Sequence, residues 1–135
     1  MVLESGDADA DKQVTVVIPP LSALYTAPAT IGGAANVVIT VPVTITNAGA
    51  TTWQPGAFNA SYHIYIPNGP LFVWDGVRTA LPAAVAPNQT VTVNVNVKVP
   101  AATGAYLVRF DVVQEGVAWF SGQGVPMGSA TLQAQ

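Results

Sequence analysis

Few residues in this chain could carry out acid–base or nucleophilic chemistry. The sequence holds one histidine, His63, and no cysteine among 135 residues. A Ser-His-Asp or Cys-His arrangement would therefore have a single base to draw on, and thiolate nucleophiles and thiolate metal sites are excluded. We expect no catalytic residue, no metal site and no cofactor, and we predict that the protein is not an enzyme.

Asp75 and Glu115 are the pair of acids that could serve a glycosidase, which needs two carboxylates about 5 to 9.5 Å apart. Arg78 follows Asp75 closely and is expected to neutralise an acid, so that an Asp/Glu–Arg pair holds two loops together. The acids could also bind Ca²⁺ with loop carbonyls, but a run of ligands like that of an EF-hand is missing. The sequence favours the structural ion pair over a hydrolase or a metal site.

Trp74, Trp119 and Phe120 are the strongest candidates for a binding function. Aromatic side chains in loops or at strand ends can stack on sugars or anchor a protein partner, because each buries about 150–250 Å² at a low cost in entropy. A tryptophan in a β-sandwich also commonly fills the core. Core burial is favoured for Trp53 and, by a smaller margin, for Trp74 and Trp119. The candidate binding residues are Trp74, Asp75, Arg78, Glu115, Trp119 and Phe120.

Alternation with period two runs through most of the chain and predicts β-strands. The clearest segment is 90–100, where valines alternate with threonine, asparagine and lysine. Segment 37–46 repeats the pattern, and Pro42 within it indicates an edge position or a bulge because proline cannot donate a ladder hydrogen bond. Further strands are predicted at Ser61–Ile66, Leu71–Trp74, Tyr106–Gln114, Val117–Phe120 and Ala130–Gln133.

Turn signals separate these strands, and Asn68-Gly69 is the strongest of them. Both residues tolerate positive φ and would join Ser61–Ile66 to Leu71–Trp74 in a hairpin. About seven to nine short strands without a helix predict an all-β fold, an immunoglobulin-like antiparallel sandwich of two sheets. An up-and-down barrel is the less favoured closure.

The sequence predicts the surroundings of two strand residues, His63 and Tyr106. His63 has the parity of Ser61 and Tyr65, opposite the apolar side of its strand, so we expect it to face solvent or to be hydrogen-bonded there. Tyr106 follows Gly104-Ala105 near the start of a late strand, which is typical of a tyrosine corner, whose hydroxyl bonds nearby backbone. We therefore assign a structural role to Tyr106, as to Trp53.

Composition limits the kinds of partner. Hydrophobic residues make up 50% of the chain and charged residues 8%, yet each apolar run is interrupted before about 18 residues, so no transmembrane helix is predicted. Beyond the acidic start the charges balance, which argues against nucleic acid as a partner. The uncharged stretch 13–74 leaves strand edges with little electrostatic defence, so homodimerisation through an edge remains open.

Residues 1–13 are acidic and lack periodicity, so we predict a disordered linker or tail followed by one sandwich domain at 14–135. The start lacks the basic and apolar regions of a secretory signal, and none is expected.

The segment 42–53, PVTITNAGATTW, and Gly104-Ala105-Tyr106 resemble the four-tryptophan (FW) immunoglobulin-like domain family. Trp53 is the one family tryptophan that is retained, while Val43 and Phe110 stand at two of the other positions. The strings WDGVRTALP at 74–82 and QEGVAWF at 114–120 are similar to a bacterial branch of such modules, often attached to envelope-associated and glycan-processing proteins. The missing tryptophans leave the assignment of a ligand open.

The resemblance implies a non-enzymatic accessory module that contacts a protein or spaces neighbouring domains in a larger bacterial envelope or surface protein. Its expected partners are a protein or the other domains of the parent chain, in an extracellular or cell-envelope location. The alternative is a glycan-binding module that uses exposed tryptophan and phenylalanine rings.

Overall fold

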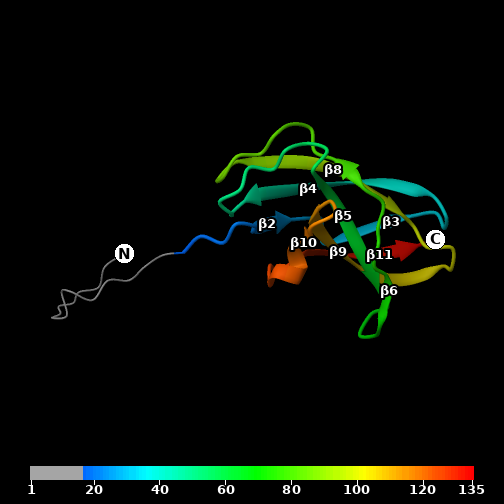
Figure 1. The fold of residues 1–135 in the computed structure, drawn as a ribbon. Helices are drawn as coiled ribbons and strands as arrows, with labels where there is room; N and C mark the ends of the chain where they lie inside the picture. The colour runs from blue at the N-terminus through cyan, green and yellow to red at the C-terminus, as the bar shows by residue number, and fades with distance from the viewer. Residues whose placement is uncertain (1–16) are drawn as a thin grey trace, which may run out of the picture.

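The computed structural model describes residues 17–135 (Figure 1). The predicted tail at 1–13 lies outside the described residues. The strands are β2 (Ala23–Thr26), β3 (Thr30–Gly33), β4 (Val38–Asn47), β5 (Phe58–Tyr65), β6 (Leu71–Val73), β7 (Thr79–Ala80), β8 (Thr90–Lys98), β9 (Gly104–Gln114), β10 (Ala118–Trp119) and β11 (Gly128–Ala134). A short 3-10 helix, η1, covers Phe120–Gln123.

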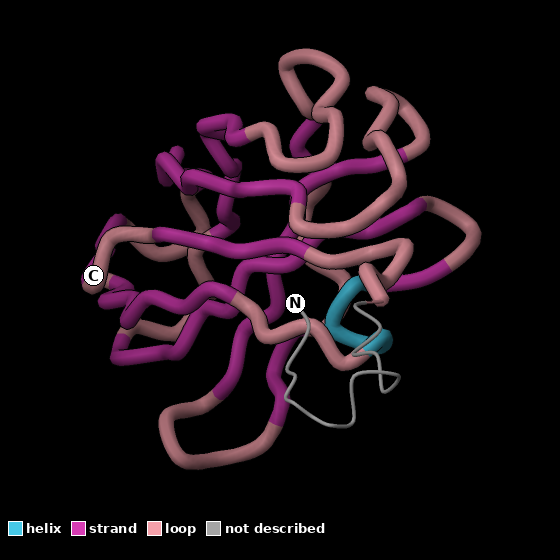
Figure 2. Tube along the Cα trace, turned by 90° about the vertical axis from the view of Figure 1, so that its left-hand side faces the viewer, coloured by secondary structure: helices cyan, strands magenta, loops and turns pink. Residues whose placement is uncertain are grey.

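Two sheets face each other, which confirms the predicted immunoglobulin-like sandwich. The larger sheet has the strand order β3-β11-β9-β5-β6, with β10 paired to β9 and β7 paired to β5. The smaller sheet has the order β2-β4-β8. The pairings are antiparallel, except that β3 runs parallel to β11. Figure 2 shows the strands as two layers with η1 to one side.

Alternation places the apolar side chains between the sheets, as the sequence predicts. Val93, Val95 and Val97 of β8 are buried, while the asparagines between them, Asn94 and Asn96, face outward. Trp53 has no exposed surface and packs edge-on against Phe120, with ring centroids 5.4 Å apart. Full burial of a large apolar side chain stabilises the fold by about 1.5–3 kcal/mol, so these residues define the core and confirm the structural role of Trp53.

Local predictions are confirmed in part. The register of β4 with β8 is continuous from Val38 to Thr46, so β4 has no bulge there. β2 pairs with β4 only from Thr44 to Asn47, so among the described residues Pro42 stands at a free edge, the other predicted alternative. In the β5–β6 hairpin, Asn68 has a positive φ of 53°, as expected, whereas Gly69 does not have a positive φ. A Cβ at Gly69 would make a tight contact with Ile66, at 3.1 Å.

Some boundaries were not predicted. Strands β2, β3 and β7 are missing from the sequence-based expectation because they span only two to four residues and show no clear alternation. The predicted strand Val117–Phe120 is wrong at its end, since Phe120 starts the helix η1. The predicted strand Ser61–Ile66 also extends too far, since β5 ends at Tyr65 and Ile66 lies in the turn, 37% exposed. Among the described residues, no helix is long and apolar enough to span a membrane.

The predicted tyrosine corner is present. The hydroxyl of Tyr106 donates a 2.7 Å hydrogen bond to the carbonyl oxygen of Ala102, four residues upstream. The ring is buried against the core, so the bond ties the loop before β9 to the sandwich.

Replacing Tyr106 by phenylalanine keeps the ring and removes only this bond. We expect the free energy of unfolding to fall by about 1 kcal/mol, because the Ala102 carbonyl loses its side-chain donor. Urea denaturation followed by circular dichroism measures the change. An unchanged midpoint at an unchanged slope would show that the corner contributes nothing to stability.

Candidate functional site

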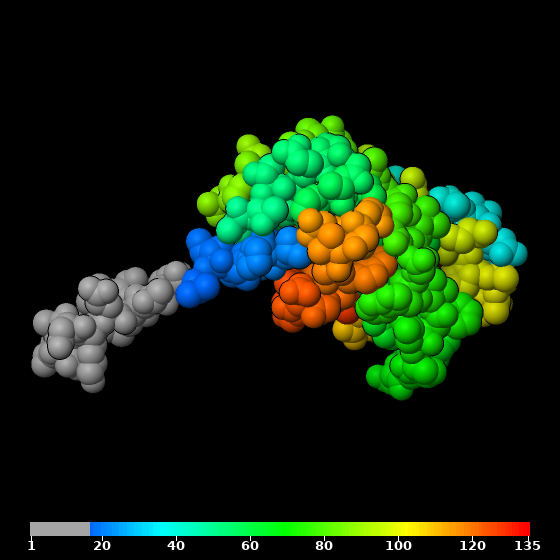
Figure 3. Space-filling view, in the orientation of Figure 1, coloured from blue at the N-terminus to red at the C-terminus, as the bar shows by residue number. Residues whose placement is uncertain are grey.

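The site forms on the outer face of the larger sheet, over its central strands β5 and β9. Tyr62 and Ile64 of β5 point into the sandwich, whereas Ser61 and His63 point to the outer face. That face is nevertheless buried here, because two segments cover it: residues 74–78, which follow β6, and β10 with η1. In the space-filling view the β10 region (orange) lies directly against the green segment that includes residues 74–78 (Figure 3).

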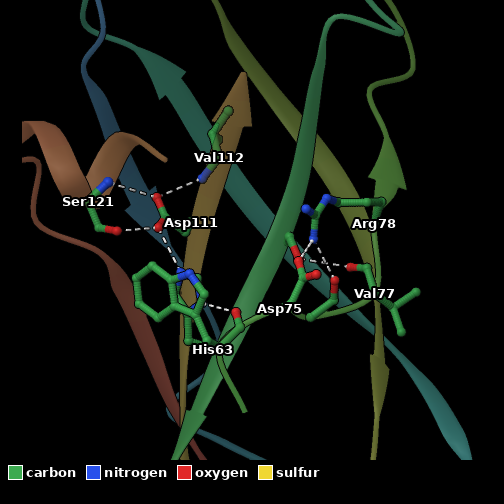
Figure 4. Close-up of polar contacts among 10 residues, drawn as sticks. His63, Asp75, Val77, Arg78, Asp111, Val112 and Ser121 are labelled. Atoms are coloured by element: carbon green, nitrogen blue, oxygen red, sulfur yellow. Dashed lines mark hydrogen bonds and ion pairs between the residues drawn. The ribbon is translucent and has the colours of Figure 1, made fainter. Parts of the chain in front are cut away.

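A hydrogen-bonded network lies beneath these two segments (Figure 4). His63 Nε2 is 2.8 Å from Asp111 Oδ2 on the neighbouring strand β9, and His63 Nδ1 contacts the carbonyl oxygen of Trp74. Ser121 of η1 donates from its hydroxyl to Asp111 Oδ2 at 2.5 Å and from its amide to Asp111 Oδ1 at 3.1 Å. The amide of Val112 adds a 2.9 Å bond to Oδ1. The network therefore joins β5, β9, the loop after β6 and the helix η1.

The prediction of a solvent-facing His63 is wrong, and the alternative of a hydrogen-bonded histidine is confirmed. The side chains of His63 and Asp111 have no exposed surface. The strand parity was right, but the outer face is covered rather than open to water. The three polar residues also differ from a catalytic triad, because the aspartate lies between the serine and the histidine. Ser121 has no bond to His63, so the histidine cannot take its proton.

An aromatic stack continues outward from the histidine. The ring of Trp74 lies parallel to that of His63, with centroids 3.7 Å apart and planes 11° apart. Trp119 of β10 meets His63 edge-on at 4.5 Å and Trp74 at 5.5 Å. Trp74 keeps 39% of its surface exposed and Trp119 is half-buried. The favoured core interpretation is therefore wrong for both rings: they lie outside the sandwich, and we call Trp74 and Trp119 the indole patch.

Arg78 joins the two segments electrostatically, as the sequence predicts. Its Nε donates to Glu115 Oε2 at 2.8 Å, and its Nη1 donates to Asp75 Oδ1 at 2.6 Å. The guanidinium also lies 4.7 Å from the centre of the Trp119 ring, which is a cation–π distance. Both candidate acids are thus bound to the same arginine.

The electrostatics of this pair argue against acid catalysis. Hydrogen bonds from Asn59 and Arg78 lower the pKa of Glu115, whereas a general acid needs a raised pKa. Burial alone would lower the pKa of Arg78, but its bonds to Glu115 and Asp75 raise it overall. The arrangement holds two loops together and keeps both partners charged. In the described part of the chain, no group of three or more histidine, aspartate or glutamate side chains is placed to bind a metal ion.

Two hollows flank the cluster. A groove of about 250 Å³ runs between Arg78 and residues 113–119, with Trp119 and Glu115 on its walls. A second pocket of about 270 Å³ has Asp75 in its lining, which is mainly apolar and includes Val73 and Val77. Five of the six predicted binding residues, Trp74, Asp75, Arg78, Glu115 and Trp119, thus form one cluster.

Phe120 is the exception, and its prediction as an exposed binding residue is wrong. It is fully buried and packs against Trp53 and Phe58. The reason is that the backbone of Trp119 is extended, and consecutive side chains of an extended chain point to opposite faces, so Phe120 points inward where Trp119 points outward.

The network of His63, Asp111 and Ser121 was missed as a unit. One signal was available: His63 and Asp111 are polar residues with apolar neighbours on either side, in Tyr62-His63-Ile64 and in Phe110-Asp111-Val112-Val113. A polar residue in a strand that is buried on both faces needs a partner. The register pairs Asp111 with Ser61 and His63 with Arg109, so His63 and Asp111 are diagonal neighbours, and the sequence alone does not show this register.

Comparisons with known proteins give likenesses to solved structures only. No family model matches the chain, and no curated protein matches it. A CARDB domain from Pyrococcus furiosus, solved with di-metal ions, has a TM-score of 0.45 at 17% identity and covers 92% of this chain and 95% of its own. A PapD-like domain of human CEP192 has a TM-score of 0.42 at 12% identity, covering 99% and 98%.

A family 123 glycoside hydrolase from Clostridium perfringens has a TM-score of 0.42 at 10% identity. The match covers 77% of this chain and only 22% of the hydrolase. The strand order and the buried core place this chain in the class of immunoglobulin-like β-sandwiches.

The loop of residues 74–78 approaches β5 too closely for a side chain at Gly76. A Cβ there would lie 2.3 Å from the carbonyl oxygen of Tyr62 and 3.0 Å from Ser61 Oγ. We expect Gly76→Ala to lower the free energy of unfolding by about 1–3 kcal/mol, as overpacking does. The matched control is Gly122→Ala, since a Cβ at Gly122 meets nothing within 4 Å. Equal stability of the two variants in chemical denaturation would contradict the close approach.

The lowered pKa of Glu115 makes stability depend on pH. A carboxyl whose pKa is lower in the folded state stabilises the fold above its unfolded pKa, and this contribution is lost as pH falls through the folded value. We expect Glu115→Gln to flatten part of the acid limb of the stability curve. The effect should stay below about 1 kcal/mol because the carboxylate is partly exposed. Denaturation midpoints from neutral to acid pH test this, and parallel curves for both proteins would refute it.

Proposed function

We propose that this domain is a non-enzymatic interaction module, and that it contacts a protein partner or the neighbouring domains of its parent protein through the indole patch. The observation that carries the proposal is the exposed surface of Trp74 and Trp119 on a rigid support. Large aromatic side chains that are held in one conformation lose little entropy on binding, which is why they recur at the centres of interfaces.

The absence of usable catalytic groups within the described residues supports the same function. The imidazole of His63 is sealed from solvent, and both acids of the cluster are bound to Arg78. The resemblance to the FW family, with its WDG and QEG strings, supports an accessory place in a larger bacterial envelope or surface protein. Family membership and location are part of this proposal.

The test is binding to the other domains of the parent protein, produced separately and mixed with this domain. We expect Trp74→Ala to weaken the interaction by about 2 kcal/mol or more, which is roughly thirtyfold, as for an interface hot spot. Phe72→Ala is the matched control, because Phe72 is an aromatic residue of 51% exposure outside the patch. Equal loss in both variants, or no binding at all by the wild-type domain, would contradict the proposal.

Glycan binding is the second candidate, and the groove beside Trp119 favours it. The groove is lined by Gln114, Glu115 and Arg78, so an aromatic wall and polar groups lie together, as in sites that stack and hydrogen-bond a sugar. A glycan array with the wild-type domain and Trp119→Ala separates the two functions. Array signals that disappear in the variant would favour the glycan over the protein partner.

A further inference from the structure

The indole ring of Trp74 has one covered face and one open face. The covered face lies parallel to the imidazole of His63, with the ring centroids 3.7 Å apart. The ring centroid of Trp119 is 4.5 Å from that of His63 but 5.5 Å from that of Trp74. Trp119 therefore lies beside the stack and does not cover the far side of Trp74. Since Trp74 is 39% exposed, its open surface includes the face that is turned away from His63.

The ring of Trp119 shows what such an indole face can hold. The guanidinium of Arg78 lies 4.7 Å from the centre of this ring and donates hydrogen bonds to two carboxylates. An indole and carboxylates thus bind one cation together. The described cations that lie over an aromatic ring are Arg78, over Trp119, and Arg109, over Tyr65. Within the described part of the chain, the open face of Trp74 has no cation of its own.

The carboxylate of Asp75, the next residue along the chain, has an oxygen available for a partner. Its Oδ1 accepts from Arg78 at 2.6 Å, whereas no described residue donates to Oδ2, and 76% of the side chain is exposed. Glu115 binds the same guanidinium. The cluster therefore presents two carboxylates against one guanidinium, and this excess of negative charge attracts cations and repels anions.

We propose that the open face of Trp74 and the Oδ2 atom of Asp75 bind an arginine side chain of the partner protein. A planar guanidinium can lie on an indole ring while its N–H groups donate to a carboxylate, and it is more weakly hydrated than an ammonium group. The partner's arginine repeats on Trp74 the arrangement that Arg78 has on Trp119. This inference deepens the proposed function, on which it rests, by naming the chemistry of the partner.

Other kinds of partner segment fit these groups less well. An acidic segment is repelled by the two carboxylates of the cluster. A purely apolar segment that covers Trp74 also takes the neighbouring Asp75 out of water, so that Oδ2 loses hydrogen bonds to water without gaining a donor. An arginine covers the indole ring and supplies that donor at the same time.

The experiment uses the whole domain with ¹⁵N-labelled tryptophan side chains, of which the chain has three. The probes are acetyl-Gly-Arg-Gly-amide and the same peptide with citrulline, which has the shape of arginine without its charge. We expect the arginine peptide to shift the indole N–H signal of Trp74 and to bind about five- to tenfold more tightly than the citrulline peptide. The signal of Trp53, which is buried, should not move. Equal affinities for the two peptides would overturn the inference.

Asp75→Asn removes the charge of the carboxylate and keeps the size of the side chain. We expect this variant to bind the arginine peptide roughly two- to fivefold more weakly than the wild-type domain does, with the citrulline peptide unaffected. Phe72→Ala is the matched control and should keep the wild-type affinity, because Phe72 is exposed but lies outside the indole patch. An equal effect of both variants, or a lysine peptide that binds as tightly as the arginine peptide, contradicts an arginine site.

Binding of the parent protein's other domains separates this inference from the proposed function. We expect Asp75→Asn to weaken that binding by the same factor as it weakens the arginine peptide, and added salt to weaken it in the wild-type domain. Binding that is lost in Trp74→Ala but kept in full in Asp75→Asn overturns the arginine and leaves the proposed function standing. Charge-dependent peptide binding without binding of any parent domain overturns the proposed function and leaves the cation site standing.

Discussion

The structure around the site depends on one constraint: every polar atom of a buried histidine–aspartate pair must have a partner. His63 and Asp111 are shut off from water, and a buried polar group that is left without a hydrogen-bond partner costs about 1–3 kcal/mol. The strands supply only some of the hydrogen-bond partners that the pair needs. The remaining donors come from η1, through Ser121, and the remaining acceptor comes from the loop after β6, through Trp74. The pair therefore fixes where both covering segments lie.

The same constraint explains why the indole patch is rigid. Trp74 is held twice, by its carbonyl oxygen against His63 Nδ1 and by its ring against the imidazole face. The other end of its loop is held by Arg78, which reaches across to Glu115 on the neighbouring segment. An aromatic surface that is fixed at both ends loses little conformational entropy when it binds a partner. The exposed side chains of an ordinary loop lose more, because they become ordered only on binding.

The sequence predicts the sandwich well and the site only in pieces. Strands β8 and β9 follow from strict alternation, and Tyr106 and Trp53 follow from their positions relative to the strands. The loop contact between Asp75, Arg78 and Glu115 follows from charge, because few charges exist to pair. The burial of His63 could not be predicted, since alternation assigns a residue to a face but does not show what covers that face. Phe120 was misplaced for a related reason: alternation puts it on the face opposite Trp119, but alternation alone does not show which of the two faces is the core.

The contacts that build this surface also argue for recognition over catalysis. A catalytic group needs a free proton site or lone pair that faces a substrate, yet each candidate here already has an internal partner. His63 is closed off on both nitrogens, and Glu115 accepts from Asn59 and Arg78 at the same oxygen. What remains open to solvent is the indole surface, Asp75 and part of Arg78 and Glu115. Groups of this kind provide apolar area and orientation, which are the requirements of binding.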